Sequence, residues 1–290
     1  LSSYEALYQD TAIDMPILSD WSKQPIERLP MALQVVRDYW PANWREDQMR
    51  SLRRAYYALC THIDHQIRIL IGTLREENLL NNTVILLTAD HGDMLGDHGL
   101  WAKRLFYEGS ARVPMILVGT KNDKKIPIGA VDDRLVGLQD VMPTLLDIAD
   151  LPIPSSVEGL SMLGPKKRNV LFGECGEERN ATRMIHDGRY KLIWYPGGQV
   201  VQLFDLQTDP RECDDLASNP AFNEIRQQLE AKMIEHLYGS DLDWISGGRL
   251  KGYVSDGSRI QPDRQLSGQR GVHYPQPPVD DPERSAIRPA

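Results

Sequence analysis

The chain has 290 residues, of which 41% are hydrophobic and 26% are charged, and its formal net charge at pH 7 is −8. This composition is typical of a globular protein with one large domain or two ordinary ones. The acidic charge argues against nucleic acid as the main partner, because phosphate binding needs a basic surface. No apolar run approaches the roughly 20 residues that cross a bilayer, so no membrane partner is predicted. The sequence does not determine whether the protein is cytoplasmic, periplasmic or secreted.

The first half of the chain begins with a segment rich in proline and tryptophan, residues 1–46, which predicts loops with short helices. Hydrophobic residues then recur every three or four positions from Gln48 to Glu77, which predicts an amphipathic helix. We expect this apolar stripe to face the core. It consists of Leu52, Tyr56, Leu59, Ile63, Ile67, Leu70 and Leu74.

Two continuous apolar runs follow this helix, at residues 84–87 and 115–118. Such runs suit strands that are covered on both faces, as in a parallel sheet flanked by helices. The later segment DVMPTLLDIADLP predicts a short helix that ends before Pro152. This alternation of helix and strand indicates an α/β fold.

The second half of the chain has a different pattern. Four short β-like segments, separated by turn signals at residues 187–188 and 196–198, predict an antiparallel meander. A helix is expected after it, with Asn219 as its N-cap and Gly239 at its end. We therefore predict one domain over residues 1–165, a small α+β domain with an antiparallel sheet and one helix over 166–240, and an extended Pro/Gly-rich tail over 241–290. If ordered, the tail must lie against this protein or a neighbouring subunit, which makes a homo-oligomer possible.

The residues after the first apolar run carry the strongest chemical signal. Asp90 and His91 stand where that strand should end, and sites in open α/β sheets lie at the carboxyl ends of strands. Both side chains can aim at one point if the backbone turns, and we expect Gly92 to permit that turn. A carboxylate and an imidazole that converge suggest a metal site, with further ligands from elsewhere. The second Asp-His-Gly, at 97–99, does not have the spacing of a calcium loop, and the three cysteines support neither a zinc ribbon nor a disulfide framework.

Several segments in order resemble one family. Residues 81–119 read NNTVILLTADHGDMLGDHGLWAKRLFYEGSARVPMILVG. Further segments read VGLQDVMPTLLDIADLP and RYKLIWYPGGQVVQLFDLQTDPRECDDLASNP. Together they resemble the sulfatase family over nearly the whole of residues 1–240. The resemblance implies part of an alkaline-phosphatase-like, doubly wound sheet domain, followed by the small C-terminal domain.

The resemblance also implies roles for single residues. Asp90 and His91 match the pair that completes a calcium site, and Lys103 matches the lysine that contacts the sulfate and the leaving oxygen. A divalent cation and an ammonium group would stabilise the charge that develops on the sulfate oxygens. The histidine leaves open another divalent metal than Ca2+, or a hydrogen bond to the sulfate. Side chains that could line the pocket and determine specificity are His98, Trp101, Arg104, Arg183, Trp244 and Tyr274.

One expected motif is missing from this sequence. Sulfatases form the formylglycine nucleophile from a C/S-x-P-x-R segment, and no Cys or Ser here has that context. We therefore expect formylglycine on an N-terminal segment that would precede Leu1. The N-terminal half of the same protein would then be a partner for both packing and chemistry, and this chain by itself would be an unstable, inactive unit.

Three functions remain open from the sequence. The first is a sulfuric ester hydrolase that acts on a small anionic aryl, choline or sugar sulfate. The second is a phosphonate monoester or phosphodiester hydrolase of the same superfamily. The third is a scaffold module without catalytic activity or metal.

Overall fold

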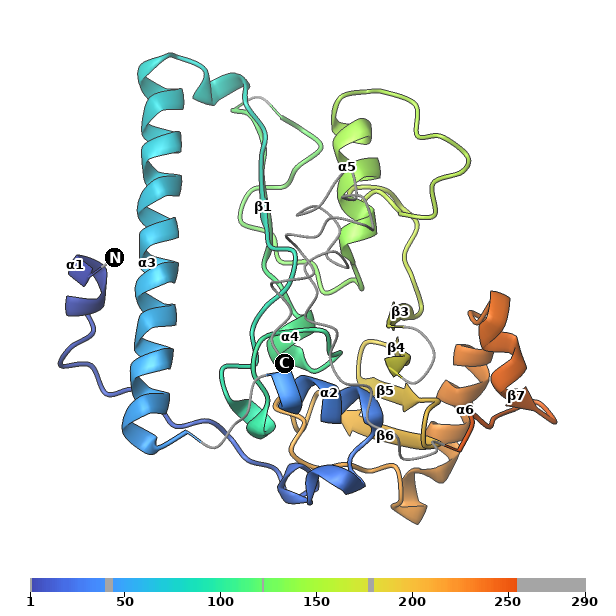
Figure 1. Ribbon diagram of the computed structural model, residues 1–290. Helices are drawn as coiled ribbons and strands as arrows, with labels where there is room; N and C mark the ends of the chain where they lie inside the picture. The colour runs from blue at the N-terminus through green and yellow to red at the C-terminus, as the bar shows by residue number, and fades with distance from the viewer. Residues whose placement is uncertain (1, 40–43, 122, 177–179, 255–290) are drawn as a thin grey trace, which may run out of the picture. The chain divides into compact units, whose positions relative to one another are not determined.

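The computed structural model describes residues 2–39, 44–121, 123–176 and 180–254 (Figure 1). The chain divides into two units, Leu1–Asp256 and Gly257–Ala290. The second unit lies outside the described residues, and so do the predicted tail contact with another subunit and Tyr274. Among the helices in the described ranges, none combines the length and the apolar character that crossing a membrane requires.

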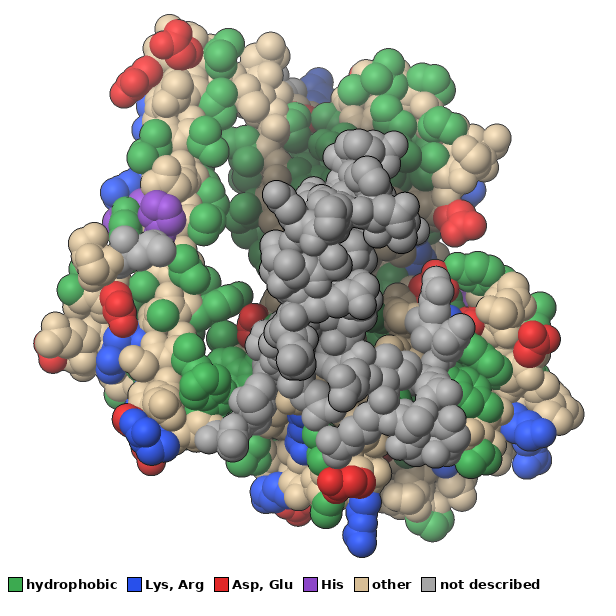
Figure 2. All heavy atoms as spheres, in the orientation of Figure 1, with side chains coloured by type: hydrophobic (Ala, Val, Ile, Leu, Met, Phe, Trp, Pro, Cys, Tyr) green, Lys and Arg blue, Asp and Glu red, His purple; other side chains and the backbone are tan. Residues whose placement is uncertain are grey.

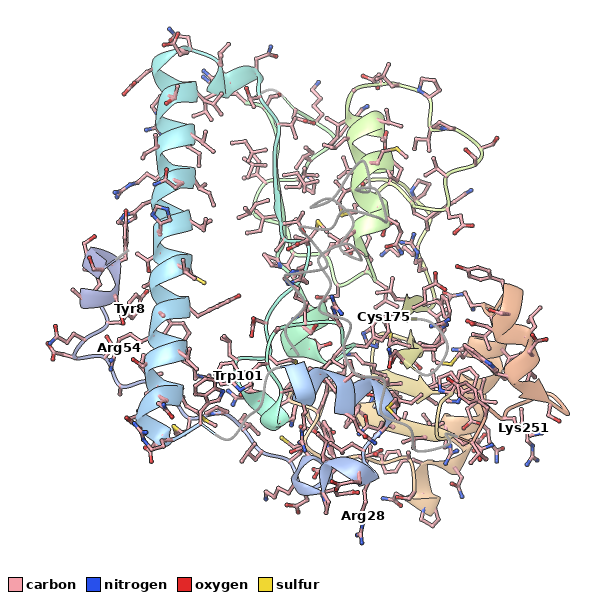
Figure 3. All side chains as sticks on the ribbon, viewed as in Figure 1. Tyr8, Arg28, Arg54, Trp101, Cys175 and Lys251 are labelled. Carbon is pink, nitrogen blue, oxygen red and sulfur yellow. The ribbon has the colours of Figure 1, made fainter. Side chains whose placement is uncertain are left out.

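The N-terminal segment consists of short helices joined by loops, as predicted. These helices are α1 (Ser2–Ala6), η1 (Trp21–Lys23), η2 (Ile26–Arg28) and α2 (Met31–Tyr39). The predicted long helix is confirmed as α3 (Glu46–Glu76). The segment that follows α1 is fixed to α3, since Arg54 Nε donates a hydrogen bond of 3.0 Å to the carbonyl of Tyr8 (Figure 3).

The apolar stripe of α3 is not buried in this chain, contrary to our expectation. Ala58 is the one buried residue along α3, which the structure describes throughout. Within the stripe, Ile63 and Leu70 are 55% and 64% exposed, and Figure 2 shows hydrophobic side chains at the surface along this helix. Periodicity shows that a face is apolar, but it does not show whether this stretch of polypeptide supplies the cover. The predicted packing against an N-terminal half stays a prediction.

The two predicted apolar strands are confirmed as β1 (Ile85–Thr88) and β2 (Met115–Val118). They pair antiparallel, with Ile85 opposite Val118 and Thr88 opposite Met115. The parallel sheet that these runs suggested is therefore wrong for this pair of strands. A continuous apolar run does not determine the direction of a strand, which depends on the connection, and here the chain turns back between residues 89 and 114. This connection contains η4 (Asp97–Gly99) and α4 (Glu108–Ala111), and a further short helix, η3 (Leu80–Asn82), lies before β1. The expected cover on both faces is also not seen for β2 within the described part of this chain, since Ile116 and Val118 are 51% and 50% exposed.

The predicted short helix after β2 is confirmed as α5 (Val141–Ile148), which follows η5 (Leu138–Asp140). Asp140 is fully buried at the start of α5. Its carboxylate pairs with Arg168 and accepts a hydrogen bond of 2.7 Å from the backbone of Leu160. This ion pair fixes the chain that leads into the C-terminal sheet.

The predicted meander is confirmed as a four-stranded antiparallel sheet in the order β3-β4-β5-β6. Its strands are Leu171–Cys175, Thr182–His186, Tyr190–Tyr195 and Val200–Asp205. One face packs against α6 (Asn223–Ile234), with Leu192 and Trp194 of the sheet in a cluster with Leu229 and Met233. Asn219 caps η7 (Pro220–Phe222), which leads into α6. The helix ends at Ile234, five residues before the predicted Gly239.

The other face of this sheet carries the loop that contains the candidate site. Ile193, Tyr195 and Phe204 belong to one buried cluster with Trp21, Leu33, Leu100, Leu105 and Tyr107. Residues on either side of Lys103 therefore pack on the C-terminal sheet. The start of the predicted tail also has regular structure, with η8 (Gly239–Trp244) and a hairpin of β7 (Ile245–Ser246) and β8 (Arg249–Leu250).

Candidate active site

The loop after β1 holds Asp90 and His91 against α4. Gly92 N donates a hydrogen bond of 2.8 Å to the carbonyl of Ser110. A Cβ atom on Gly92 would lie 2.2 Å from the carbonyl oxygen of Gly109, so only glycine fits here. The backbone of Gly92 is not in the left-handed region. We expected this glycine to allow an unusual turn, whereas the structure requires it for the close approach of two backbones.

The side chains of Asp90 and His91 converge as predicted. His91 Nδ1 lies 2.8 Å from the carbonyl oxygen of Gly92. A carbonyl only accepts, so Nδ1 carries the hydrogen, and the lone pair of the neutral ring is on Nε2. That nitrogen lies 3.3 Å from Oδ2 of Asp90. Nε2 and Oδ2 are close enough to bind one cation together, either a proton, as in an Asp–His ion pair, or a metal ion.

The chemistry of this pair fits a divalent metal ion. A histidine ligand commonly donates its other ring N–H to a backbone carbonyl, as His91 does, and a carboxylate is a hard ligand suited to Ca2+. When bound, such an ion polarises an oxyanion and stabilises the charge that develops on it. Within the described ranges, no three His, Cys, Asp or Glu side chains lie close enough to hold a metal. Asp90 and His91 are thus a candidate pair of ligands and not a complete metal site within those ranges.

Lys103 lies on the next loop, which is hydrogen-bonded to the first. Asp93 Oδ1 accepts a hydrogen bond of 3.1 Å from the backbone of Ala102, and Met94 N donates one of 2.9 Å to the carbonyl of Ala102. The structure thus brings the Asp90–His91 loop and the Lys103 loop side by side. Lys103 is partly buried, between Ala102 with φ 59° and Arg104 with φ 78°. Non-glycine residues in this left-handed region cost about 1–3 kcal/mol each and concentrate at functional sites.

Two family models match the chain. The one described as "Sulfatase" matches residues 8–151. The one described as "N-sulphoglucosamine sulphohydrolase, C-terminal" matches residues 96–238. The chain belongs to the sulfatase family.

Two relatives agree with this assignment. The chain is 34% identical over 258 residues to an arylsulfatase of Clostridium perfringens, which covers 86% of this chain and 53% of that protein. It is 34% identical over 192 residues to a choline-sulfatase of Rhizobium meliloti, with 63% of this chain and 36% of that protein covered. This sulfatase chain thus spans about half the length or less of these relatives.

The structure resembles that of a phosphonate monoester hydrolase from Silicibacter pomeroyi. The TM-score is 0.69 at 23% identity, and the match covers 84% of this chain and 53% of that one. A likeness at this identity shows the fold alone. The predicted alkaline-phosphatase-like fold is confirmed.

His98, the further substrate-binding candidate in this sulfatase chain, is buried and fully bonded to the protein. Its Nδ1 lies 3.0 Å from Ser19 Oγ, and its Nε2 lies 2.9 Å from the carbonyl oxygen of Arg211. Its ring also packs against Trp21, with 4.8 Å between the ring centroids. The substrate role stays a prediction, and the geometry favours a packing role. The second Asp-His-Gly is structural as well, since Asp97 Oδ1 accepts from the backbone of Ile17.

The burial of His98 predicts a pH dependence of stability. Burial lowers the pKa of His98, and the carbonyl of Arg211 opposes that shift. The folded state therefore binds this proton less tightly than the unfolded chain. The stabilising contribution is complete above the ordinary pKa of about 6.5 and is lost as the pH falls through the lowered value.

We expect the melting temperature to fall between pH 7 and pH 5, and to fall less in the variant His98→Gln than in wild type. Thermal unfolding at both pH values measures this difference in slope. His186→Gln should show a similar effect, because burial also lowers the pKa of His186. The exposed His236 supplies the control variant His236→Gln. Equal slopes in wild type and His98→Gln would contradict the prediction.

Most of the other side chains proposed to determine substrate specificity contact other residues of this protein or are buried. Arg183 forms a buried ion pair with Asp241, with Nε 2.5 Å from Oδ2, and its guanidinium lies 5.7 Å from the ring centroid of Trp244. These three residues line a cavity of about 1,070 Å³ between the C-terminal sheet and η8. Trp101 is 9% exposed, and its Nε1 has no hydrogen-bond partner in the described residues.

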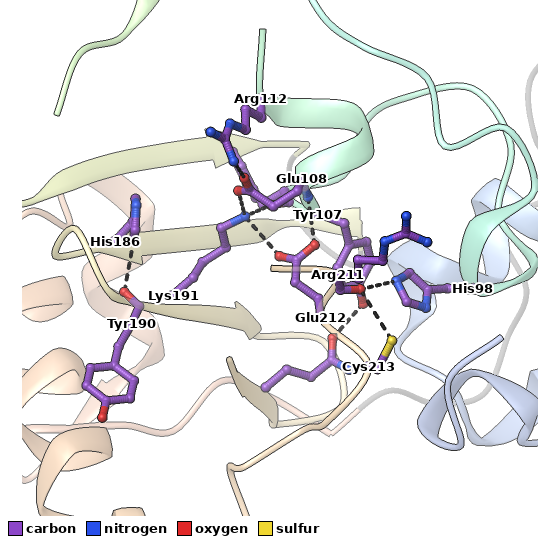
Figure 4. A network of polar contacts seen from close by, with 12 residues as sticks. His98, Tyr107, Glu108, Arg112, His186, Tyr190, Lys191, Arg211, Glu212 and Cys213 are labelled. Carbon is purple, nitrogen blue, oxygen red and sulfur yellow. Dashed lines mark hydrogen bonds and ion pairs between the residues drawn. The ribbon is translucent and has the colours of Figure 1, made fainter. Parts of the chain in front are cut away.

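A buried charge network beside the Lys103 loop was not predicted (Figure 4). Lys191 Nζ lies 2.5 Å from Oε1 of Glu108 and 2.9 Å from Oε1 of Glu212. Burial raises the pKa of the Glu212 carboxyl, and Lys191 opposes that shift. The signal in the sequence was that each of these residues lies in a segment that resembles the family.

Proposed function

We propose that this chain is part of a sulfuric ester hydrolase and supplies two metal ligands, Asp90 and His91, and one catalytic residue, Lys103. The observation that carries the proposal is the hydrogen-bonded contact between two loops. One loop presents a carboxylate and an imidazole 3.3 Å apart at the end of β1, and the other presents Lys103 between two left-handed residues. Membership of the sulfatase family and the likeness to an arylsulfatase support sulfate ester hydrolysis.

The chemistry of a sulfate ester accounts for these residue types. Attack on sulfur moves negative charge onto the sulfate oxygens and the leaving oxygen. The ammonium group of Lys103 stabilises that charge and favours departure of the leaving group, because a preorganised cation needs little rearrangement in the transition state. Local cations also overcome the repulsion between an anionic substrate and a chain of net charge −8. The formylglycine nucleophile is expected from polypeptide outside this sequence.

A second candidate function has one observation in its favour. The solved structure with a TM-score of 0.69 is a phosphonate monoester hydrolase. A phosphonate monoester also develops charge on its oxygens, so a metal ion and an ammonium group would serve it equally well. The two activities therefore differ in the shape and charge of the pocket rather than in Asp90, His91 or Lys103.

The full-length protein that contains this chain can decide between the two. We expect kcat/KM for 4-nitrophenyl sulfate to exceed kcat/KM for 4-nitrophenyl phenylphosphonate by at least about tenfold, a difference of about 1.4 kcal/mol in transition-state stabilisation. The release of 4-nitrophenol measures both reactions. The opposite preference would establish that the protein is a phosphonate monoester hydrolase. If metal-loaded protein hydrolysed neither ester, the result would favour a scaffold module without catalytic activity.

A further inference from the structure

The buried charge network lies beside the segment that follows Lys103. Glu108 begins α4, Lys191 lies on β5, and Glu212 lies beyond the end of β6 (Figure 4). Lys191 and Glu212 are 2% and 1% exposed. Neither side chain is open to a substrate, so neither is a catalytic residue. A lysine this deeply buried needs its two carboxylates, because an unpaired charge in the interior is strongly destabilising.

The network holds main chain as well as side chains. Lys191 Nζ donates a hydrogen bond of 2.9 Å to the carbonyl of Phe106. Glu212 Oε2 accepts one of 2.7 Å from the backbone N–H of Glu108. Between these two points the hydroxyl of Tyr107 lies 2.9 Å from that of Tyr195 on β5. Three consecutive residues, beginning three positions after Lys103, are thus bonded to the C-terminal sheet or the loop that follows it.

Lys103 therefore lies between two anchored segments. On one side, Ala102 is bonded to Asp93 and Met94. On the other side, Phe106 and Glu108 are bonded to the network. The left-handed backbone at Ala102 and Arg104 persists only where its surroundings hold it, because that conformation is unfavourable for side chains with a Cβ.

We propose that Lys191, with Glu108 and Glu212, is a positioning residue that fixes Lys103 by fixing the backbone of Phe106–Glu108. The C-terminal sheet then has a part in the reaction without contact with substrate. It is the platform on which the lysine loop is held, and this role rests on the proposed function of Lys103. Misplacement of a catalytic group by about 1 Å can cost about a hundredfold in rate, so the platform should matter for kcat more than for KM.

A double-mutant cycle in the full-length protein tests the coupling. We expect Lys191→Met to lower kcat for 4-nitrophenyl sulfate by about 10- to 100-fold, with KM changed less than about threefold. In a Lys103→Ala background the same substitution should change kcat less than about twofold, because there is no longer a lysine to position. Glu212→Gln loses one acceptor and serves as the second test if Lys191→Met does not fold.

Tryptic cleavage supplies a readout that needs no activity. Trypsin cuts after lysine and arginine, and Lys103–Arg104 offers two adjacent sites. Under native conditions, we expect trypsin to cut the folded variants Lys191→Met and Glu212→Gln there at least about ten times faster than wild type. The reason is that local opening of the backbone controls the rate of cleavage. Arg168→Met, which breaks the buried pair with Asp140 elsewhere, is the matched control and should leave cleavage at this site unchanged.

The outcomes separate the two proposals. Unchanged cleavage at Lys103–Arg104, or additive effects of Lys191→Met and Lys103→Ala on kcat, would overturn the positioning role. Faster cleavage in a protein that hydrolyses no sulfate ester would support the platform and refute the sulfatase activity. Faster cleavage together with a kinetic effect that disappears in Lys103→Ala is the result that we expect.

Discussion

Replacing Lys103 by alanine in the full-length protein is expected to lower kcat/KM for a sulfate ester by about 30- to 1,000-fold, or about 2–4 kcal/mol of transition-state stabilisation. The lost ammonium group no longer stabilises charge on the leaving oxygen. Stability should change little, because Lys103 is only partly buried and its amine forms no ion pair with the described residues. Steady-state kinetics with 4-nitrophenyl sulfate and thermal unfolding measure the two effects.

The leaving group gives this prediction a sharper form. A cation beside the leaving oxygen matters most when that oxygen is a poor leaving group. The loss in kcat/KM in Lys103→Ala should therefore be larger for phenyl sulfate than for 4-nitrophenyl sulfate. Lys125→Ala is the matched control, since Lys125 is exposed and pairs with Asp150 outside this loop. If Lys103→Ala were within about twofold of wild type for both esters, Lys103 would have no catalytic role.

Periodic patterns in the sequence predicted much of the fold, because local spacing determines helices and meanders. The three-and-four spacing gave α3, and alternating segments with turn signals gave β3 to β6. The same patterns could not give the direction of β2 relative to β1 or the exposure of the α3 stripe. Both depend on residues distant in the sequence, and the stripe also depends on which other polypeptide is present.

The sequence predicted the candidate metal ligands, Asp90 and His91, but not the network around Lys191. Asp90 and His91 stand just beyond the end of β1, so a rule about strand ends was sufficient to name them as candidates. The positioning network was missed because 104 sequence positions separate Glu108 from Glu212. In addition, most lysines lie at the surface, and apart from its place in a segment that resembles the family, the sequence around Lys191 does not distinguish it from these. Lys191 is buried because it lies on the face of β5 that packs against the segment after Lys103.

Replacing Asp90 is expected to have the second large effect on activity, because Asp90 is a predicted metal ligand and its side chain is exposed. We expect Asp90→Ala in the full-length protein to remove most of the stoichiometric divalent metal and to lower kcat/KM for 4-nitrophenyl sulfate by at least about a hundredfold, comparable to the loss of one preorganised oxyanion donor. Elemental analysis after gel filtration measures the metal, and kinetics with 4-nitrophenyl sulfate measure the activity. Asp133→Ala replaces another exposed aspartate and should leave both unchanged.

A readout without catalysis makes the test of Asp90 independent of the reaction. A ligand that binds only the folded state raises stability with its concentration, so added CaCl2 should raise the melting temperature of metal-stripped wild type and not that of Asp90→Ala. The Asp90 side chain is 85% exposed, so its loss removes a ligand and little packing. The melting temperatures of the two proteins should therefore agree when no metal is present. If Asp90→Ala kept one metal per chain and the same response to CaCl2, the ion would be bound elsewhere, and the close approach of Asp90 and His91 would need another explanation.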